Sequence, residues 1–581
     1  MLVAPHAARR DTVRHPWRAG GVRVNDLYTA DVALELAERF DGDAIVNAAL
    51  DRNDVDLNRL RQVLRHGRWF LEALAARVET LVERHGELLV LFVHGWNVVN
   101  PICDCGVGSA PPPGDGWAMP AVPVDVTGTV DARFLDGRLR ALRTACAASG
   151  IATVCGWRYP ASHPENLLQL FTGRYRAHGD PLLAGLARLG EVVNAVQLEL
   201  SISLRWPGPW RERFADAAVA TLGSREPHPL RTVSDAPAAA RTPDAIQPGG
   251  PVALQFHDRV TGLAGVAALE PGGRRASRLL IVPPDGQVHL YTGELPAEPP
   301  SEATEPMRPE HGSSPAPTVA RTADGCLELT YDGPMVRFSN TTPFLDLEAG
   351  LREATLVRGV VALRFTPAVA ADDTARPTMH DHGDEKRPSR RSGPAMKERT
   401  PADTGAAAAP TPTAFGRGFA MVSGRVCLAP ASQDTLADEP TRAEAWDGAA
   451  SLDGPGFVDH VLFGGRRLAA TVSEGALGAL RIVVPARGID GARCWSSDPL
   501  TELSVGAARV LGRDRDAPGP LAEIVVSGTD GRSARIVCDA VHRIPVVRQG
   551  RAGKVAEHVL AFCRFRLDDR PAGQGWIEAM L

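Results

Sequence analysis

Short apolar runs alternate with amphipathic segments over the first 225 residues or so. The runs have the length of buried strands and are Leu2–Pro5, Ala44–Leu50, Leu88–Val93, Ile151–Trp157 and Ala195–Leu200. Between them, segments 28–40 and 138–150 repeat apolar residues with the period of a helix, and the second ends at Gly150, as helices often do. Strand, helix and strand in repetition predict an α/β domain with a mostly parallel sheet covered by helices.

The pattern changes after a Pro-, Ala- and Asp-rich stretch at 226–250, which we interpret as a linker. Short β-rich runs then recur to the end of the chain, several with Asp-Gly turns, such as CLELTYDGPMVRFS and AEIVVSGTDG. This spacing is typical of an antiparallel barrel or sandwich. A polar stretch at 367–413 interrupts the runs, and we expect it to be disordered because it has little apolar surface to bury.

These patterns together predict a multi-domain chain, α/β followed by all-β. We expect the α/β domain at 1–225, a linker at 226–250, a first β domain at 251–366, a disordered linker at 367–413 and a second β domain at 414–581.

Composition narrows the classes of function. The 581 residues carry 64 basic and 69 acidic side chains, a formal charge of −5, which argues against a dedicated nucleic-acid or membrane-surface binder. The lysines are Lys386, Lys397 and Lys554, and none stands in a GxxxxGK[ST] loop, so a Walker-type nucleotide site is excluded. Nine cysteines without a CxxC pair and no apolar run of ~20 residues predict a cytoplasmic protein with no membrane span.

Four chemically reactive side chains stand at or near the ends of apolar runs in the first domain. They are His6, Arg52, His94 and Glu199. Ligands of an open parallel sheet bind beyond the carboxyl ends of its strands, so we expect these groups on one rim. Each alone has a structural alternative, since a histidine at a strand end often only donates a hydrogen bond.

The segment from Arg52 to Arg59, RxxxDLNR, is dense in groups that recognise a planar anion. Arginine forks bind carboxylates bidentately, and Asn58 adds a neutral donor. The alternative is a helix entry with Asp56 as the N-cap.

With these residues in order, the N-terminal domain resembles the N-formylglutamate amidohydrolases and, more distantly, the zinc carboxypeptidases. The shared pattern is Pro5-His6, the RxxxDLNR segment, His94-Gly95 at a strand end and a late strand with Glu199. The resemblance implies a zinc-dependent hydrolase that cleaves an amide next to a free carboxylate, in an N-acyl amino acid or a peptide tail.

The same resemblance assigns roles to individual residues. His6 and His94 match the zinc-binding histidines, Arg52 the arginine that polarises the scissile carbonyl, and Glu199 the general base. Asn58 and Arg59 match the pair that holds the carboxylate of a small-molecule substrate.

The third metal ligand departs from the carboxypeptidase pattern. HxxE would require an acid where this chain has Arg9, so we assign Asp26 instead, following the amidohydrolases. The alternative for Asp26 is the N-cap of helix 28–40. The insert at about 100–130 is expected to be a flexible flap that contains Cys103 and Cys105.

The β-rich half resembles the tandem lipocalin-like barrel pair of carotenoid 1,2-hydratases and tocopherol cyclases. The resemblance rests on Phe256-His257-Asp258, on the segment 453–460 and on the closing Phe565–Asp568 and Gly573–Glu578 stretches. It implies a secondary site at Asp459 and His460 and a barrel able to hold an apolar ligand. However, the polar-Trp step expected after the DH pair is missing, which favours the alternative that both residues only form hydrogen bonds within a barrel turn.

Three functions therefore stay open at this point. The first is zinc-dependent amide hydrolysis. The second is a lipocalin-like binding protein for an apolar small molecule with a degenerate hydrolase domain, and the third is an isoprenoid hydratase or cyclase in the β half. Phe92–Asn97 also resembles the oxyanion turn of α/β-hydrolases, but the chain has no GxSxG elbow to supply the serine.

Overall fold

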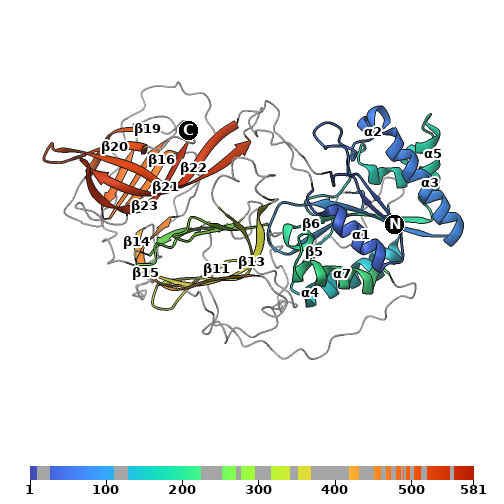
Figure 1. The fold of residues 1–581 in the computed structure, drawn as a ribbon, viewed down its shortest axis with the longest axis horizontal. Helices are drawn as coiled ribbons and strands as arrows, with labels where there is room; N and C mark the ends of the chain where they lie inside the picture. The colour runs from blue at the N-terminus through green and yellow to red at the C-terminus, as the bar shows by residue number, and fades with distance from the viewer. Residues whose placement is uncertain are drawn as a thin grey trace, which may run out of the picture.

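The computed structural model separates into an α/β domain at one end of an elongated molecule and two antiparallel β sheets beyond it (Figure 1). It describes residues 1–8, 26–109, 129–223, 252–258, 260–269, 277–294, 316–339, 351, 353–367, 418–430, 450–459, 466–472, 479–485, 489, 492–496, 503–511, 520–549 and 555–580. The linker expected at 226–250 and nearly all of the one expected at 367–413 lie outside these residues. No helix within the described ranges is long and apolar enough to cross a membrane.

The α/β domain contains a six-stranded mixed sheet. Its order is β2 (Ala44–Val46), β1 (Leu2–Ala4), β3 (Leu88–Gly95), β6 (Val193–Leu200), β4 (Ile102–Gly106) and β5 (Ala152–Val154). The first four are parallel, whereas β4 runs antiparallel to β6, and β5 is parallel to β4. The predicted runs thus become strands, and the sheet is parallel over β2, β1, β3 and β6.

Strand β4 corrects one prediction. Cys103 and Cys105 were expected in a flexible flap, but both lie in β4 and are fully buried. Alternation explains this placement, because the two thiols pack into the core on one face while Asp104 points to the other.

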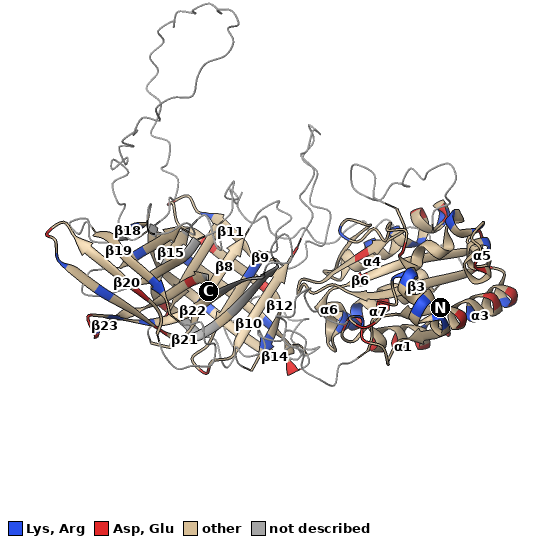
Figure 2. Cartoon of the chain, turned by 90° about the horizontal axis from the view of Figure 1, so that it is seen from above, with Lys and Arg blue, Asp and Glu red and all other residues tan. Residues whose placement is uncertain are grey.

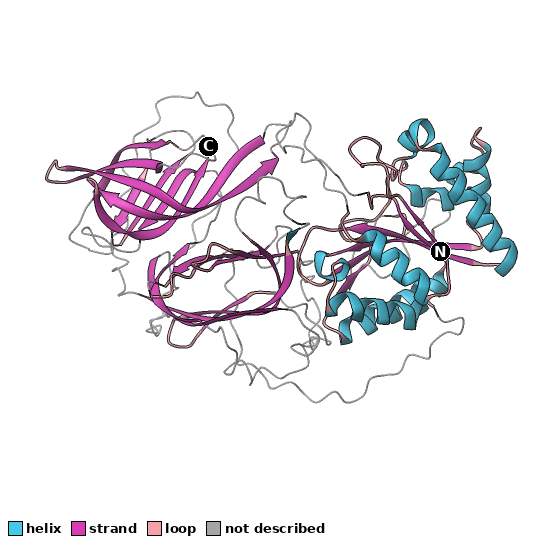
Figure 3. Cartoon of the chain, viewed as in Figure 1, coloured by secondary structure: helices cyan, strands magenta, loops and turns pink. Residues whose placement is uncertain are grey.

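Helices cover both faces of this sheet, as Figure 3 shows. On one face α1 (Thr29–Arg39), α4 (Arg140–Ala148) and α7 (Pro209–Leu222) bury apolar side chains against the sheet. On the other face α2 (Leu60–His66), α3 (Arg68–His85) and α5 (Pro181–Leu189) do so. The remaining helical segments are η1 (Phe134–Leu139), η2 (Leu167–Phe171), η3 (Gly173–Tyr175) and α6 (Ile202–Arg205). Basic and acidic residues are interspersed along α3 (Figure 2).

The first β sheet closes into a barrel. Its strands are β7 (Val252–His257), β8 (Ala264–Leu269), β9 (Ser277–Val282), β10 (Val288–Gly293), β11 (Thr318–Arg321), β12 (Leu327–Phe338), β13 (Thr355–Pro367), β14 (Gly418–Pro430) and β15 (Ala450–Asp459). They follow the order β10-β9-β8-β7-β15-β14-β13-β12-β11, and an additional pairing of β10 with β12 closes the ring.

The boundary between the β sheets differs from the expected one. The sequence places the second β domain at 414–581, whereas β14 and β15 pair with β13 and β7 of the first barrel, so the sheet changes only after residue 459. The polar stretch between β13 and β14 does not prevent the two strands from pairing, because the entropic cost of closing a loop grows only slowly with its length.

The second sheet is eight-stranded and antiparallel. Its strands are β16 (Arg466–Val472), β17 (Leu480–Pro485), β18 (Arg493–Ser496), β19 (Leu503–Val510), β20 (Pro520–Gly528), β21 (Ser533–Gln549), β22 (Val555–Leu567) and β23 (Arg570–Met580). It packs on the first barrel through Trp576, whose Nε1 donates to the Phe256 carbonyl at 3.2 Å. Thr471 Oγ1 also donates to Gln255 Oε1 at 2.7 Å.

The α/β domain and the first barrel share one apolar core. Leu27, Val99, Ile202 and Trp206 belong to the same cluster as the barrel interior. The backbone N–H of Val99 donates to the Thr292 carbonyl at 2.6 Å. The segment after β3 is therefore attached to the end of β10.

Candidate metal centre

Three ionisable side chains form a row across the α/β sheet. His94 is the register partner of Glu199 across β3 and β6, and Glu199 is the partner of Asp104 across β6 and β4. Register partners point to the same face of a sheet, so the three side chains lie side by side near the carboxyl ends of β3 and β6. Each is at most 7% exposed.

Two more residues complete a cluster beside His94. His6 follows β1, and Asp26 precedes α1. Asp26 Oδ2 lies 3.2 Å from His6 Nδ1 and 3.3 Å from His94 Nδ1, and the two rings meet edge to face with centroids 4.9 Å apart. The structure thus brings together the three side chains that the resemblance implied as metal ligands.

The cluster fits a metal ion. His6, Asp26 and His94 each offer a ligand atom, all within 4.8 Å of one another, and all three side chains are buried. Tetrahedral zinc with ligand distances of ~2.0–2.1 Å separates neighbouring ligand atoms by ~3.3 Å, close to the spacings around Asp26 Oδ2. These spacings use His94 Nδ1, whereas His94 Nε2 is, within the described part of the chain, buried and without a hydrogen-bond partner.

Asp56 contacts the ring nitrogen of His6 that faces away from Asp26. Its Oδ1 lies 2.7 Å from His6 Nε2, so the other ring nitrogen is directed at Asp26. Metal-binding histidines commonly bond a carboxylate through the second nitrogen in this way. The alternative role as an N-cap is not seen, because α2 begins at Leu60 and has Arg59, without a side-chain cap bond, at its N-cap.

Asp26 likewise does not cap α1 with its carboxylate. The helix begins at Thr29 and has Tyr28 at its N-cap. Asp26 contributes only its carbonyl oxygen, which accepts from the Thr29 backbone N–H at 3.2 Å and from Thr29 Oγ1 at 2.6 Å. The carboxylate is thereby left to face the histidines and Arg52.

The arginines of the RxxxDLNR segment lie beside this cluster. Arg52 Nη1 donates to Asp26 Oδ1 at 2.9 Å. Arg59 Nε lies 4.0 Å from Asp56 Oδ2, and the Arg59 side chain is 34% exposed, so an anion from solvent can reach it. Asn58 is buried, and its Oδ1 accepts from the Leu167 backbone N–H at 3.3 Å.

Glu199 is held by a chain of amides. Gln197 Nε2 donates to Glu199 Oε1 at 2.8 Å, and Gln197 Oε1 accepts from Asn166 Nδ2 at 2.9 Å. Sequence reasoning missed Gln197 and Asn166. The signal for Gln197 was present, since it stands two residues before Glu199 and therefore on the same face of the strand.

Burial and nearby charges shift the pKa values of the cluster. Burial raises the pKa of Glu199 well above its usual value, and the carboxylates of Asp26 and Asp104 raise it further. Burial lowers the pKa of His94 to about 4, which leaves a neutral imidazole, the form that binds a metal. The pKa of Asp26 lies well below its usual value because hydrogen bonds to His6 and His94 outweigh the effect of burial.

Asp104 anchors the turn that borders the row, a role sequence reasoning also missed. Its carboxylate accepts the backbone N–H groups of Trp157, Arg158 and Tyr159 at 3.1, 2.7 and 2.8 Å. The ring of Tyr159 packs edge-on against Trp96, with centroids 5.5 Å apart. An aromatic wall therefore stands next to the row.

The secondary site expected in the β half is not defined by the structure. Asp459 ends β15 opposite Ala253, but its side chain and all of His460 lie outside the described residues.

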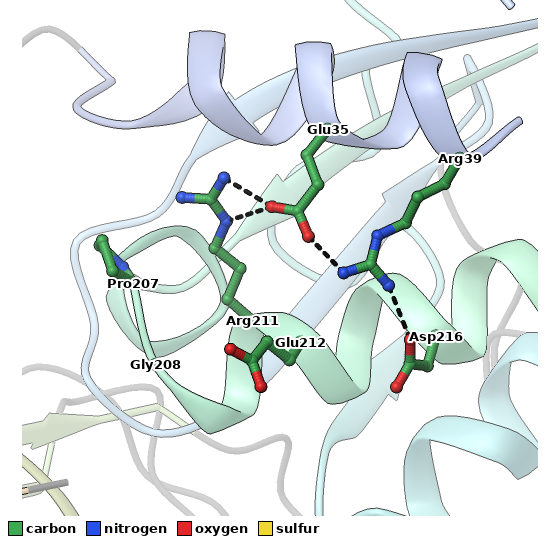
Figure 4. Close-up of a pocket in the computed structure, with 7 residues that line it drawn as sticks. All are labelled: Glu35, Arg39, Pro207, Gly208, Arg211, Glu212 and Asp216. Carbon is green, nitrogen blue, oxygen red and sulfur yellow. Dashed lines mark hydrogen bonds and ion pairs between the residues drawn. The ribbon is translucent and has the colours of Figure 1, made fainter. Parts of the chain in front are cut away.

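A separate pocket of about 540 Å³ lies between α1 and α7 (Figure 4). It is lined by charged side chains that pair with one another: Glu35 with Arg39 at 2.7 Å and with Arg211 at 2.6 Å, and Arg39 with Asp216 at 2.6 Å. Both helices cover the sheet face opposite the one that carries the row, so this pocket is not part of the metal cluster.

Comparisons with known proteins add little to this geometry. No protein-family model matches the chain, and no curated protein matches it either. Among solved structures, a candidate AttH from Nitrosomonas europaea is 10% identical with a TM-score of 0.23, over 56% of this chain and 90% of that one. A TM-score this low carries no argument about function.

Proposed function

We propose that the α/β domain is a zinc-dependent hydrolase that cleaves an amide next to a free carboxylate, as in an N-acyl amino acid or a peptide tail. The observation that carries the proposal is the buried His6, Asp26 and His94 cluster with Glu199 beside it on the neighbouring strand. His6, Asp26 and His94 would hold the ion, which leaves a fourth position for water or substrate.

Zinc bound there supplies Lewis-acid activation of water and of the scissile carbonyl. The protein groups do the rest of the work. Glu199, the register partner of His94 on the neighbouring strand, takes the proton of the attacking water and delivers it to the leaving amine nitrogen. The Arg52 guanidinium lies next to Asp26 and would bind the carbonyl oxygen as negative charge develops on it.

Recognition of the free carboxylate is assigned to Arg59 and Asn58. Arg59 is part exposed, whereas Asn58 is buried and its Oδ1 accepts from the Leu167 backbone N–H, so the pair offers one part-exposed and one buried donor side chain. A guanidinium favours a carboxylate because its fork donates two parallel hydrogen bonds.

Metal analysis and one substitution test this function. The full chain expressed with zinc should retain the metal, and a His6→Ala/His94→Ala variant should not. Glu199→Gln should keep zinc while hydrolysis of N-formyl and N-acetyl amino acids falls at least about 100-fold, because the general base is lost. Glu191→Gln, at an exposed surface ion pair, is the matched control and should be fully active. Wild-type protein that holds no more zinc than the double variant would overturn the proposal.

We propose ligand binding by the first barrel as a second function. Tyr291 and His289 lie on the same face of β10 and are at most 4% exposed. Tyr291 Oη and His289 Nδ1 lack hydrogen-bond partners among the described residues. Unpaired buried polar atoms are costly, and a polar group on a bound apolar small molecule would supply a missing partner. Native mass spectrometry of the full chain should detect a copurified ligand that Tyr291→Phe reduces; identical spectra for the two proteins would contradict this role.

A further inference from the structure

Arg205 is a buried cation behind the metal cluster. It ends α6 and is 1% exposed. Its guanidinium bonds three separate segments of the domain. Nε donates to the Leu200 carbonyl of β6 at 3.0 Å, and Nη1 donates to the Leu27 carbonyl at 2.7 Å. Nη2 donates to Asn97 Oδ1 at 3.1 Å and to the Trp96 carbonyl at 3.4 Å.

Two of these segments carry metal ligands. Leu27 follows Asp26 directly, and Trp96 and Asn97 come two and three residues after His94. The third acceptor, Leu200, follows Glu199. One side chain thus bonds backbone positions that adjoin two ligands and the general base.

Gly95 shows how tightly the guanidinium is held. A Cβ on Gly95 would lie 2.6 Å from Arg205 Nη1, 2.7 Å from Arg205 Cζ and 3.0 Å from Asp26 Cβ. Only glycine leaves room for the guanidinium between the strand end and the Asp26 segment. The glycine after His94 is therefore required by Arg205.

Burial of the Arg205 guanidinium costs free energy, so its presence in the interior indicates a role other than stability. Transfer of a guanidinium out of water costs several kcal/mol, and a neutral side chain of similar volume often gives equal or greater stability. Here the acceptors are uncharged, and the nearby carboxylates of Asp26 and Glu199 favour the charged form. An arginine is suited to this place because its planar fork fixes several acceptors at once.

We propose that Arg205 is the positioning residue of the metal site: it holds the Asp26 and His94 segments at the separation that the ion needs. This inference rests on the zinc site of the proposed function. It predicts that loss of Arg205 weakens metal binding more than it weakens the fold, because the segments stay connected to the sheet but their relative position is released.

The test compares variants of the full chain by Zn²⁺ affinity, measured by competition with a chromophoric chelator. Arg205→Met should lower the affinity about 10- to 100-fold, the range found when outer-shell support of a metal ligand is removed. Arg39→Met is the matched control, since it removes two ion pairs on α1 that do not involve the cluster, and it should bind Zn²⁺ like the wild type. Visible spectra of the Co²⁺-loaded proteins report ligand geometry, and only Arg205→Met should lose intensity of the tetrahedral bands.

If Arg205→Met does not fold, a milder variant tests the same inference. Asn97 is exposed and contributes one acceptor, so Asn97→Ala should fold and lower the Zn²⁺ affinity by a smaller factor. Wild-type Zn²⁺ affinity in Arg205→Met, or in Asn97→Ala where the former is unfolded, overturns this inference and leaves the proposed function intact. A wild-type chain that binds no Zn²⁺ overturns both.

Discussion

Asp56 determines which nitrogen of His6 faces the cluster. Its bond to Nε2 leaves Nδ1 next to Asp26 Oδ2, and hydrogen bonds to His6 and its Coulomb attraction hold the pKa of Asp56 well below its usual value. The Asp56 carboxylate is therefore charged at neutral pH, where it accepts a hydrogen bond from the His6 imidazole. A single residue of the RxxxDLNR segment thus sets the orientation of one metal ligand.

Asp56→Asn should reduce Zn²⁺ affinity about 10- to 100-fold, because the neutral amide orients His6 less firmly and raises its basicity less. Chelator competition measures the effect. Asp54→Asn, at an exposed carboxylate two residues earlier, is the control and should leave the affinity unchanged. Equal affinities in the two variants would contradict the role of Asp56.

Arg59→Ala should raise KM for an N-acyl amino acid about 10- to 100-fold with little change in kcat, since a charge-assisted hydrogen bond contributes about 1.5–3 kcal/mol. Steady-state kinetics on substrates with and without the free carboxylate measures it. Arg61→Ala is the control, because Arg61 is 78% exposed and pairs with Glu165. An unchanged KM in Arg59→Ala would remove the residue from the anion site.

At the scale of elements, strand β4, which runs antiparallel to β6, extends the row of ionisable side chains beyond Glu199. It places Asp104 opposite Glu199, and Asp104 in turn fixes the turn 157–159 that bears Tyr159. Without the reversal, the row would end at β6.

Asp104→Ala should lower the free energy of unfolding by about 2–4 kcal/mol, because three backbone N–H groups lose one charged acceptor. Urea unfolding followed by circular dichroism measures it. Asp131→Ala removes an exposed carboxylate that accepts from the Phe134 backbone N–H, and should cost only about 1 kcal/mol. Similar losses in both variants would show that the turn does not depend on Asp104.

The sequence predicts several strands and site residues of the α/β domain but not others, and the difference has physical reasons. Apolar runs locate β1, β3 and β6 because strands buried on both faces need continuous apolar residues. Strand β4 escapes notice because Asp104 interrupts it, and its position beside β6 depends on contacts far along the chain. His94 and Glu199 could be assigned to one rim from the strand ends, whereas Asp26 came only from the family resemblance. Arg205 carries no periodic signal, since α6 is only four residues long.

At the scale of the whole molecule, a single apolar cluster joins the α/β domain and the two β sheets. It contains Trp206 of the α/β domain, the barrel interior and Trp576 of the second sheet. Asn100, fully buried, donates from Nδ2 to the Glu294 carbonyl across the first interface. A change that destabilises one of these parts should therefore also lower the stability of the others.

Zinc at 100 times its Kd should stabilise the folded chain by about 2.7 kcal/mol. The midpoint temperature of a single thermal transition that includes the barrel should therefore rise. Scanning calorimetry of the full chain with zinc and after chelation measures it. Asn100→Ala should weaken the coupling and split the transition, with only the lower-temperature part responding to zinc. Two separate transitions already in the wild type would contradict a shared cooperative unit.

The pairing of β7 with β15 also has a consequence during synthesis. Gly456 pairs with Phe256 about 200 residues after it, so the barrel cannot close until both have left the ribosome. At 5–20 residues per second, the nascent chain spends about 10–40 s with the complete α/β domain emerged and its docking face bare. Val99, Ile202 and Trp206 then stay exposed to water. Chaperone demand in the cell should consequently concentrate on this interval of translation.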